Sequence, residues 1–374
     1  MKKINRRNFL GVAGSVASGI MIVPRHVLGG PGHTAPSDKL NIAGIGVGGM
    51  GTADLRGMES ENIVALCDVD SKRAAGSFQR YPKAARYKDF RVMLEKQKDI
   101  DAVVIATPDH VHAVASMDAI KMEKHVYCEK PLTHTLYEAR QLTKAAKEAK
   151  VATQMGTQGH ASESIRQLCE WIWDGAIGDV HEVQAWTPHP VWPQGINRPK
   201  ETPPVPDTLD WDLWLGPAPY RPYHPKYLPT MWRGWWQFGT GGLGDMGCHI
   251  LDPIFWALKL HAPASVEASY STYVPTGLNW DKPRNLETFP RASMITYRFA
   301  ARDKFSSLKL TWYDGGLIPP RPEELEPGRS MGDKYGGILF LGTKGKILSG
   351  SHGANGVRII PEEKMRAYRQ PPKT

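Results

Sequence analysis

The sequence predicts an α/β fold with two sheets, a parallel sheet followed by a mostly antiparallel one. From residue 40 to about residue 155, apolar runs of strand length alternate with helical patterns, which indicates a parallel sheet with helices on both faces. A glycine-rich turn follows the first apolar run, and beyond residue 264 strand-like runs follow one another directly. A chain of 374 residues has room for two domains, and we place them at 38–158 and 159–374.

The glycine-rich turn has the spacing of a dinucleotide-binding site. Gly46 permits a tight strand-to-helix turn, Gly48 lets backbone N–H groups approach a pyrophosphate, and Gly51 allows close helix–strand packing. Asp68 ends the next apolar run, where a carboxylate can accept hydrogen bonds from a ribose diol. These features predict a Rossmann domain, and a purely structural turn in another α/β domain is the alternative. The predicted cofactor contacts of this region are Gly46, Gly48, Gly49, Met50, Gly51 and Asp68.

Apolar periodicity predicts the remaining elements of both domains. In the first domain, ligands are expected outside the carboxyl ends of the strands. The predicted strands are 40–45, 62–67, 102–106, 125–128, 151–155, 178–187, 265–274, 291–300, 305–313, 337–342 and 346–349, and the predicted helices are 50–59, 71–79, 88–97, 111–122, 135–149 and 160–174.

Two predicted strand ends carry polar chemistry. Thr107-Pro108-Asp109-His110-Val111-His112 follows one strand, and Glu129-Lys130-Pro131 follows another. A lysine at a strand's carboxyl end faces the cofactor edge of the sheet, where its ammonium can donate to a substrate oxygen. A solvated surface lysine is the alternative.

The N-terminus predicts export. Arg6-Arg7-Asn8-Phe9-Leu10 is similar to the twin-arginine signal, so we exclude residues 1–35 from the fold. No Ala-x-Ala follows Val23, which leaves an uncleaved membrane anchor open, although no run reaches the roughly 18 apolar residues of a membrane span. Much of the net charge of +9 lies in this segment, and no basic stripe elsewhere argues for nucleic acid.

The four cysteines predict neither a disulfide frame nor a metal site. They are widely spaced, form no C-x-x-C motif and stand in apolar contexts, so we expect buried thiols. They are Cys67, Cys128, Cys169 and Cys248.

The segment 187–244 is rich in Pro and Trp and has little periodicity. Long irregular loops in compact domains are usually functional, and flat aromatic faces suit the C–H faces of sugar rings. Aromatic residues that pack the loop itself are the alternative. The predicted substrate contacts are Trp192, Arg198, Tyr223, Arg233 and Trp236.

A glycine-rich stretch then leads into a predicted helix with polar residues on one face. Asp245, His249 and Asp252 fall at i, i+4 and i+7. Two neighbours at i+4 do not complete a three- or four-ligand zinc site, so we expect no metal. An acid that orients an imidazole for proton transfer is the preferred interpretation.

With these motifs in one order, the chain resembles the Gfo/Idh/MocA oxidoreductases, which include glucose–fructose oxidoreductase and inositol dehydrogenase. The resemblance covers about 38–350 and implies a C-terminal α/β domain with an open sheet, which often carries a dimer or tetramer contact. It also implies that Lys130 and His249 share the proton work while Asp245 holds the geometry. Further cofactor contacts are expected at Thr107, Pro108, His110, His112, Glu129, Lys130 and, near the nicotinamide, Gln158.

The chemistry implied is hydride transfer between a sugar or glycoside carbon and a nicotinamide. Asp68 favours NAD, but the following Ser71, Lys72 and Arg73 leave NADP open. Because no free nicotinamide pool is expected outside the cytoplasm, an exported, periplasmic enzyme would hold its cofactor tightly and regenerate it in the site.

Two rival functions stay open. One is a glycoside hydrolase or epimerase that oxidises its substrate transiently, and the other is a sugar-binding relative without turnover. Members of this subgroup usually continue beyond the position of Thr374, so a truncated C-terminus is left open. They also tend to carry Arg where this chain has His189, so substrate contacts there are not transferred.

Overall fold

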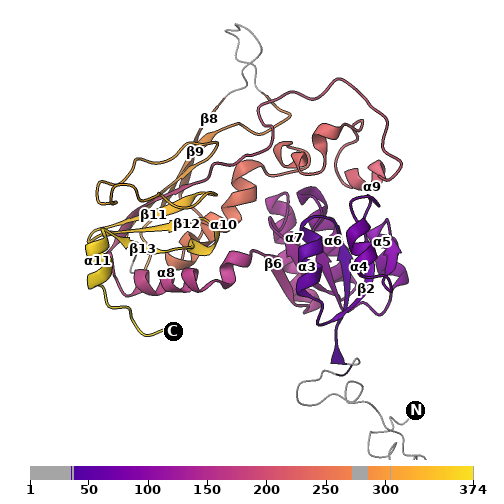
Figure 1. Ribbon diagram of the computed structural model, residues 1–374, viewed down its shortest axis with the longest axis horizontal. Coiled ribbons are helices and arrows are strands. Elements are labelled where there is room, and N and C mark those ends of the chain that lie inside the picture. Colours follow the sequence, from indigo (N-terminus) through magenta and orange to yellow (C-terminus); the bar gives the residue numbers. More distant parts are fainter. Residues whose placement is uncertain (1–34, 36–37, 272–284, 304, 374) are drawn as a thin grey trace, which may run out of the picture.

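The computed structural model describes residues 35, 38–271, 285–303 and 305–373, which form two domains lying side by side (Figure 1). The twin-arginine-like string lies outside the described residues. Within the described part of the chain, no helix is long and apolar enough to cross a membrane.

The first domain contains a six-stranded, fully parallel sheet in the order β3-β2-β1-β4-β5-β6. Val103 and Ile105 of the central strand β4 are fully buried, because helices cover both faces of the sheet. The strands are β1 (Asn41–Ile45), β2 (Asn62–Cys67), β3 (Ala85–Tyr87), β4 (Ala102–Ile105), β5 (His125–Glu129) and β6 (Thr153–Gly156), and the helices are α3 (Met50–Gly57), α4 (Ala75–Arg80), α5 (Phe90–Lys96), α6 (Asp109–Lys121) and α7 (Leu136–Ala149).

The second domain contains a seven-stranded sheet in the order β13-β12-β11-β7-β10-β9-β8. Only the β7–β10 pair is parallel among its described ladders. The strands are β7 (Val180–Trp186), β8 (Ser265–Tyr270), β9 (Ser293–Phe299), β10 (Leu308–Tyr313), β11 (Gly337–Gly342), β12 (Lys346–Gly350) and β13 (Arg358–Ile360), and the helices are α8 (Glu163–Trp173), α10 (Gly241–Ala257) and α11 (Glu362–Ala367).

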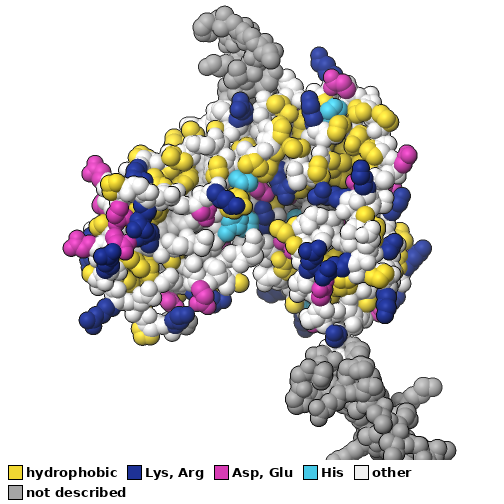
Figure 2. Space-filling model, in the orientation of Figure 1, with side chains coloured by type: hydrophobic (Ala, Val, Ile, Leu, Met, Phe, Trp, Pro, Cys, Tyr) yellow, Lys and Arg dark blue, Asp and Glu magenta, His cyan; other side chains and the backbone are white. Residues whose placement is uncertain are grey.

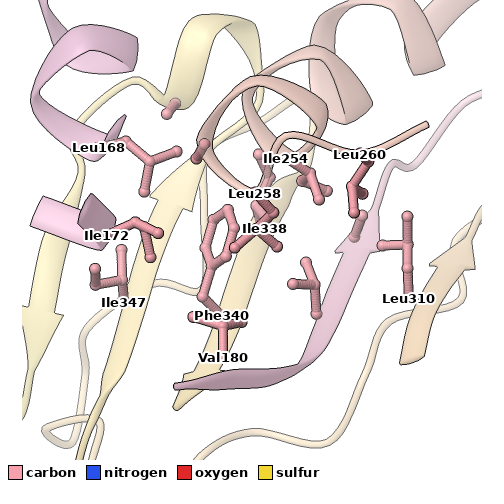
Figure 3. Close-up of a cluster of buried hydrophobic side chains, with 14 of the residues drawn as sticks. Leu168, Ile172, Val180, Ile254, Leu258, Leu260, Leu310, Ile338, Phe340 and Ile347 are labelled. Atoms are coloured by element: carbon pink, nitrogen blue, oxygen red, sulfur yellow. The ribbon is translucent and has the colours of Figure 1, made fainter. Parts of the chain in front are cut away.

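Helices α8 and α10 cover one face of this second sheet. Leu168 of α8 and Ile254 of α10 point toward Phe340 of β11, and all three are fully buried (Figure 3). Burial of apolar surface, at about 25 cal/mol per Å², stabilises this layer. The predicted fold class, a parallel Rossmann-type sheet plus a mostly antiparallel sheet, is confirmed.

The Trp-rich segment forms a small aromatic core of its own, which packs against Val69 of the first domain. Arg221 is 1% exposed, and its guanidinium lies 4.9 Å from the ring centre of Phe238 and 5.7 Å from that of Trp235. The short helices of the segment are α9 (Trp211–Leu215), η3 (Pro225–Tyr227) and η4 (Met231–Gly234). The buried aromatic residues are Trp211, Trp214, Tyr227, Trp232, Trp235 and Phe238. The sugar-stacking interpretation is therefore wrong for these four tryptophans, because their side chains are buried in this cluster.

Candidate active site

The glycine turn connects β1 to α3 with tight backbone packing. Gly46 has a φ of +78°, in the left-handed region that favours glycine. A Cβ atom on Gly51 would lie only 2.0 Å from the carbonyl oxygen of Gly46, so no larger residue fits there. Such a turn, opening a helix at Met50, leaves N–H groups free for a diphosphate. The residues therefore fit a dinucleotide, and the individual contacts stay predictions.

Asp68 supports the turn from the end of β2. One carboxylate oxygen accepts hydrogen bonds from the backbone N–H groups of Val47 (2.9 Å) and Gly48 (3.2 Å), and the other accepts from the N–H of Asp70 (2.9 Å). Burial raises the pKa of Asp68, although these hydrogen bonds oppose the shift. Its contact with a ribose stays a prediction.

Of the residues named for a 2′-phosphate, Ser71 is bonded elsewhere and Arg73 lies beside the glycine turn. The backbone N–H and hydroxyl of Ser71 donate to the carbonyl of Thr208, at 2.9 and 3.3 Å. A Cβ atom on Gly49 would lie 2.6 Å from a guanidinium nitrogen of Arg73, so this side chain lies against the glycine turn. The region therefore combines the carboxylate of Asp68 with one nearby cation.

Lys130 and Asp245 form an ion pair that joins the two domains. Lys130 follows β5, Asp245 lies in α10, and the ammonium donates to the carboxylate and to the backbone carbonyl of Asp245, both at 2.9 Å. Their side chains are 11% and 10% exposed. The solvated-lysine alternative is thus wrong, because Lys130 is buried against a carboxylate.

Two further side chains surround the carboxylate of Asp245. Arg233 donates to it at 3.1 Å, and the ring of His189 lies 3.6 Å away. Burial alone would raise the pKa of Asp245, but the charges of Lys130 and Arg233 lower it below its usual value. Burial lowers the pKa of His189, with Asp245 opposing the shift. The cluster therefore holds a charged carboxylate between two fixed cations.

His249 lies on α10 one turn beyond Asp245 but does not bond to it. It is 3% exposed, its Nδ1 has no partner among the described residues, and burial lowers its pKa to about 3. The expectation that Asp245 orients the imidazole of His249 is corrected, because the carboxylate is occupied by Lys130 and Arg233. Asp252 bonds His160 instead, at 3.0 Å, away from this cluster.

Sequence reasoning missed His352 and Tyr335. His352 stacks on His249 with ring centres 4.2 Å apart, and Tyr335 meets its edge at 5.3 Å. Figure 2 shows histidine side chains gathered where the two domains meet. No sequence motif relates His352 to α10, because about 100 residues separate them. His352 begins the 3₁₀ helix η5 (His352–Ala354), and the fold of the second sheet brings it to the site.

His110 and His112 are not available to a cofactor, which corrects the prediction. Both are nearly fully buried, and each ring nitrogen faces a backbone carbonyl. For His110 these are the carbonyls of Phe238 and Trp214, at 3.2 and 3.1 Å, and burial lowers its pKa to about 4. For His112 they are those of Pro131 and Thr107, at 2.7 and 2.8 Å. Thr107 and Pro108 remain at the end of β4.

Glu129 and Gln158 lie on either side of Gly156. Glu129 is 7% exposed, and a Cβ atom on Gly156 would lie 2.5 Å from its carboxylate, so the two residues are closely packed. Burial raises the pKa of Glu129. Gln158 begins the 3₁₀ helix η2 (Gln158–Ala161) and is exposed. Cofactor contacts by both residues stay predictions.

The five predicted substrate residues are not brought together. Arg233 lies in the cluster with Trp192, which is 8% exposed and donates to Gln194. Arg198 pairs with Glu287 at 3.0 Å, and Tyr223 packs edge-on against Trp211. Trp236 is 47% exposed and stacks on Phe289. All five side chains have structural partners, but Arg233 belongs to the Asp245 cluster and Trp236 is exposed, so these two are the stronger candidates.

The four cysteines are free thiols, and Cys67, Cys128 and Cys169 are buried. Within the described ranges, no group of three or more His, Cys, Asp or Glu side chains is placed to hold a metal ion.

Comparison with known sequences identifies the family. Residues 40–157 match the model described as an oxidoreductase family with an NAD-binding Rossmann fold, and residues 180–275 match that of the oxidoreductase family's C-terminal α/β domain. Both models are of the Gfo/Idh/MocA type, and together they match more than half of the chain. The chain belongs to the Gfo/Idh/MocA oxidoreductase family.

Individual relatives match part of this chain. An inositol 2-dehydrogenase of Rubrobacter xylanophilus is 31% identical over 160 residues, which cover 40% of this chain and 44% of that protein. A glycosyl hydrolase family 109 protein of Shewanella pealeana is 30% identical, over 48% of this chain and 44% of its own. The chain thus spans less than half the length of either relative.

Among solved structures, the WlbA dehydrogenase from Bordetella pertussis in complex with NADH and UDP-GlcNAcA has a TM-score of 0.58 and 19% identity, covering 86% of this chain and 82% of that one. At this identity the likeness supports the two-domain fold alone.

Proposed function

We propose that this protein is an NAD-dependent oxidoreductase that moves a hydride between a hydroxyl-bearing carbon of a sugar or glycoside and a tightly held nicotinamide. The observation that carries the proposal is the buried Lys130–Asp245 pair, which places a fixed ammonium at the carboxyl edge of a Rossmann sheet. Ligands bind at this edge in open α/β sheets. The dehydrogenase names of the relatives favour a polyol or sugar substrate.

The residues divide the work as follows. The glycine turn and Asp68 would hold the dinucleotide, whose nicotinamide supplies the hydride-accepting carbon when bound. Two donor positions of the Lys130 ammonium are used by Asp245, which leaves a third for the reacting oxygen. That donor stabilises negative charge on the oxygen as its proton leaves. The neutral ring of His249 lies beside it and excludes water.

The first experiment uses protein purified in its folded form without added nucleotide. After denaturation, any released nucleotide is identified by mass, which also decides between NAD and NADP. The reduced-nicotinamide absorbance of the native protein is then followed with myo-inositol, levoglucosan and methyl glycosides. A change with one sugar supports the proposal, whereas absence of bound nucleotide and of uptake would refute it.

The role of Lys130 is tested separately with Lys130→Ala. Loss of the ammonium should lower the rate of nicotinamide reduction by about 10²-fold or more. Lys144→Ala, at a position where the side chain is 72% exposed, is the matched control and should keep the wild-type rate. Equal rates for the two variants would remove Lys130 from the mechanism.

A transient-redox hydrolase or epimerase is the second candidate, and the glycosyl hydrolase family 109 relative favours it. It would convert a glycoside without lasting reduction of bound nucleotide. Two further features belong to the proposal. One is export to the periplasm by the twin-arginine machinery, with an uncleaved anchor as the alternative. The other is a dimer or tetramer formed through the sheet face opposite α8 and α10. The N-terminal string and the family resemblance support them.

A further inference from the structure

A hydrogen-bonded chain of three side chains, Asp333, Ser351 and His352, lies beside the site. The hydroxyl of Ser351 lies 3.0 and 3.1 Å from the two carboxylate oxygens of Asp333 and 2.8 Å from Nδ1 of His352. Asp333 also accepts the backbone N–H groups of Tyr335 (2.8 Å) and Ser351 (2.9 Å), so its position is fixed. Ser351 is fully buried.

The direction of these hydrogen bonds determines which nitrogen of His352 is basic. A carboxylate only accepts, so the Ser351 hydroxyl hydrogen points to Asp333. The Ser351 oxygen must then accept from Nδ1–H of His352. His352 is therefore held as the Nδ1–H tautomer, and its Nε2 carries the free lone pair.

His352 lies inside the charged cluster and is only half-buried. Its ring stacks on His249 at 4.2 Å between centres and meets the ring of Tyr335 at 5.3 Å. Burial and the charge of Lys130 lower its pKa, while Asp333 and Asp245 oppose the shift. The ring is thus neutral near neutral pH, and Asp333 is in a position to stabilise a proton gained there.

Other side chains of the cluster are less suited to accept a proton from the substrate hydroxyl. His249 has no partner for Nδ1 among the described residues, and its pKa is lowered to about 3, so a charged ring there is unsupported. Lys130 holds its ammonium form against the carboxylate of Asp245 and acts as a donor. Among the described rings of the cluster, His189 lies 3.6 Å from Asp245 without a hydrogen bond, whereas the half-buried ring of His352 is linked to Asp333 through the hydroxyl of Ser351.

We infer that His352 is a catalytic base of this site and that Ser351 and Asp333 are its positioning residues. This inference rests on the proposed function. As a substrate C–H bond gives its electron pair to the oxidised nicotinamide, the O–H bond breaks, its proton forms the N–H bond at Nε2 of His352, and the oxygen's electrons form the C=O bond. The resulting imidazolium donates through Ser351 to Asp333, and the reverse steps reduce a carbonyl.

The test compares His352→Asn and Ser351→Ala with His261→Asn, a control at an exposed position outside the site. Single-turnover nicotinamide reduction is measured across pH with the sugar that the wild-type protein oxidises, and NADH affinity is measured by fluorescence. Lys130, Asp245, His189, His249, Asp333 and Tyr335 face the ring and are unchanged in all three variants.

His352→Asn should slow the step by about 10²-fold or more with unchanged NADH affinity, and added imidazole should restore part of the rate. Ser351→Ala should move the acidic limb of the pH–rate profile to lower pH, because the imidazolium loses its acceptor. Wild-type rate and profile in His352→Asn would overturn the inference. If His352→Asn does not fold, Ser351→Ala decides, and an acidic limb of its pH–rate profile at the wild-type position overturns the inference. If the wild-type protein and His261→Asn reduce no nicotinamide, the proposed function itself fails.

Discussion

Replacing His249 with asparagine should flatten the dependence of stability on pH. His249 is 3% exposed, and burial, with Lys130 and His352, lowers its pKa from 6.5 to about 3. A histidine with a depressed folded-state pKa contributes stability that is complete above the unfolded value and is lost as pH falls below it, because the unfolded state binds the proton first. The loss therefore falls between about pH 6.5 and pH 3.

The size of the effect follows from the same values. At about pH 4.5, two pH units below the unfolded value, the wild-type protein should lose about 3 kcal/mol through this one ring relative to about pH 7.5. Other groups, among them His189, His352 and Asp245, change stability in the same direction, so only the difference between wild type and His249→Asn isolates the ring.

Urea unfolding of nucleotide-free protein at the two pH values measures this difference. His249→Asn is expected to be less stable at the higher pH and to lose about 3 kcal/mol less than wild type on acidification. His261→Asn, at an exposed position, should behave as wild type. An equal pH dependence in wild type and His249→Asn would show that the ring is solvated or paired, and would refute the reasoning.

Two further predictions concern the turn and the aromatic segment. Gly51→Ala should abolish NADH binding measured by fluorescence, because its Cβ atom would lie 2.0 Å from the Gly46 carbonyl, whereas Gly57→Ala, with nothing within 4 Å, should bind as wild type. Equal binding by both would contradict the packing described for α3. Trp235→Ala, at 1% exposure, should lower the free energy of unfolding by about 3–5 kcal/mol in urea titrations. Trp236→Ala, at 47% exposure, should leave stability within about 1 kcal/mol and raise the KM for the sugar. A destabilised Trp236→Ala with unchanged KM would assign that ring to packing.

The strands that the sequence predicted are those with a strong apolar pattern. β1, β2 and β4 lie inside the parallel sheet and read as continuous apolar runs, so they were found within one residue at each end. β3 and β13 were missed because each has three residues and a single neighbour at the edge of its sheet. Residues 272–274 of the strand predicted at 265–274 lie outside the described residues.

The aromatic segment shows where composition stops being informative. Many tryptophans in an irregular loop are compatible with a sugar site and with a local core, because the sequence does not say which ring covers which. In the structure the buried guanidinium of Arg221 lies against the rings of Tyr227, Trp235 and Phe238, so this cation is part of the local core. Nothing in the sequence indicated His352 either, because its role depends on hydrogen bonds to the hydroxyl of Ser351 and, through it, to the carboxylate of Asp333.

Three residues of the strand-end motif after β4, Asp109, His110 and His112, make structural contacts around the junction of the two domains. Asp109 accepts a hydrogen bond from Thr240 at the start of α10, and His110 is held by two carbonyls of the aromatic segment. His112 ties the end of β4 to the carbonyl of Pro131, next to Lys130.

These three side chains thereby set where α10 stands relative to β5, and hence where Asp245 meets Lys130. Because the ammonium of Lys130 and the carboxylate of Asp245 come from different domains, small shifts in docking change the distance between them directly. Asp109, His110 and His112 therefore support the site without touching a ligand, since they hold Lys130 and Asp245 at hydrogen-bonding distance.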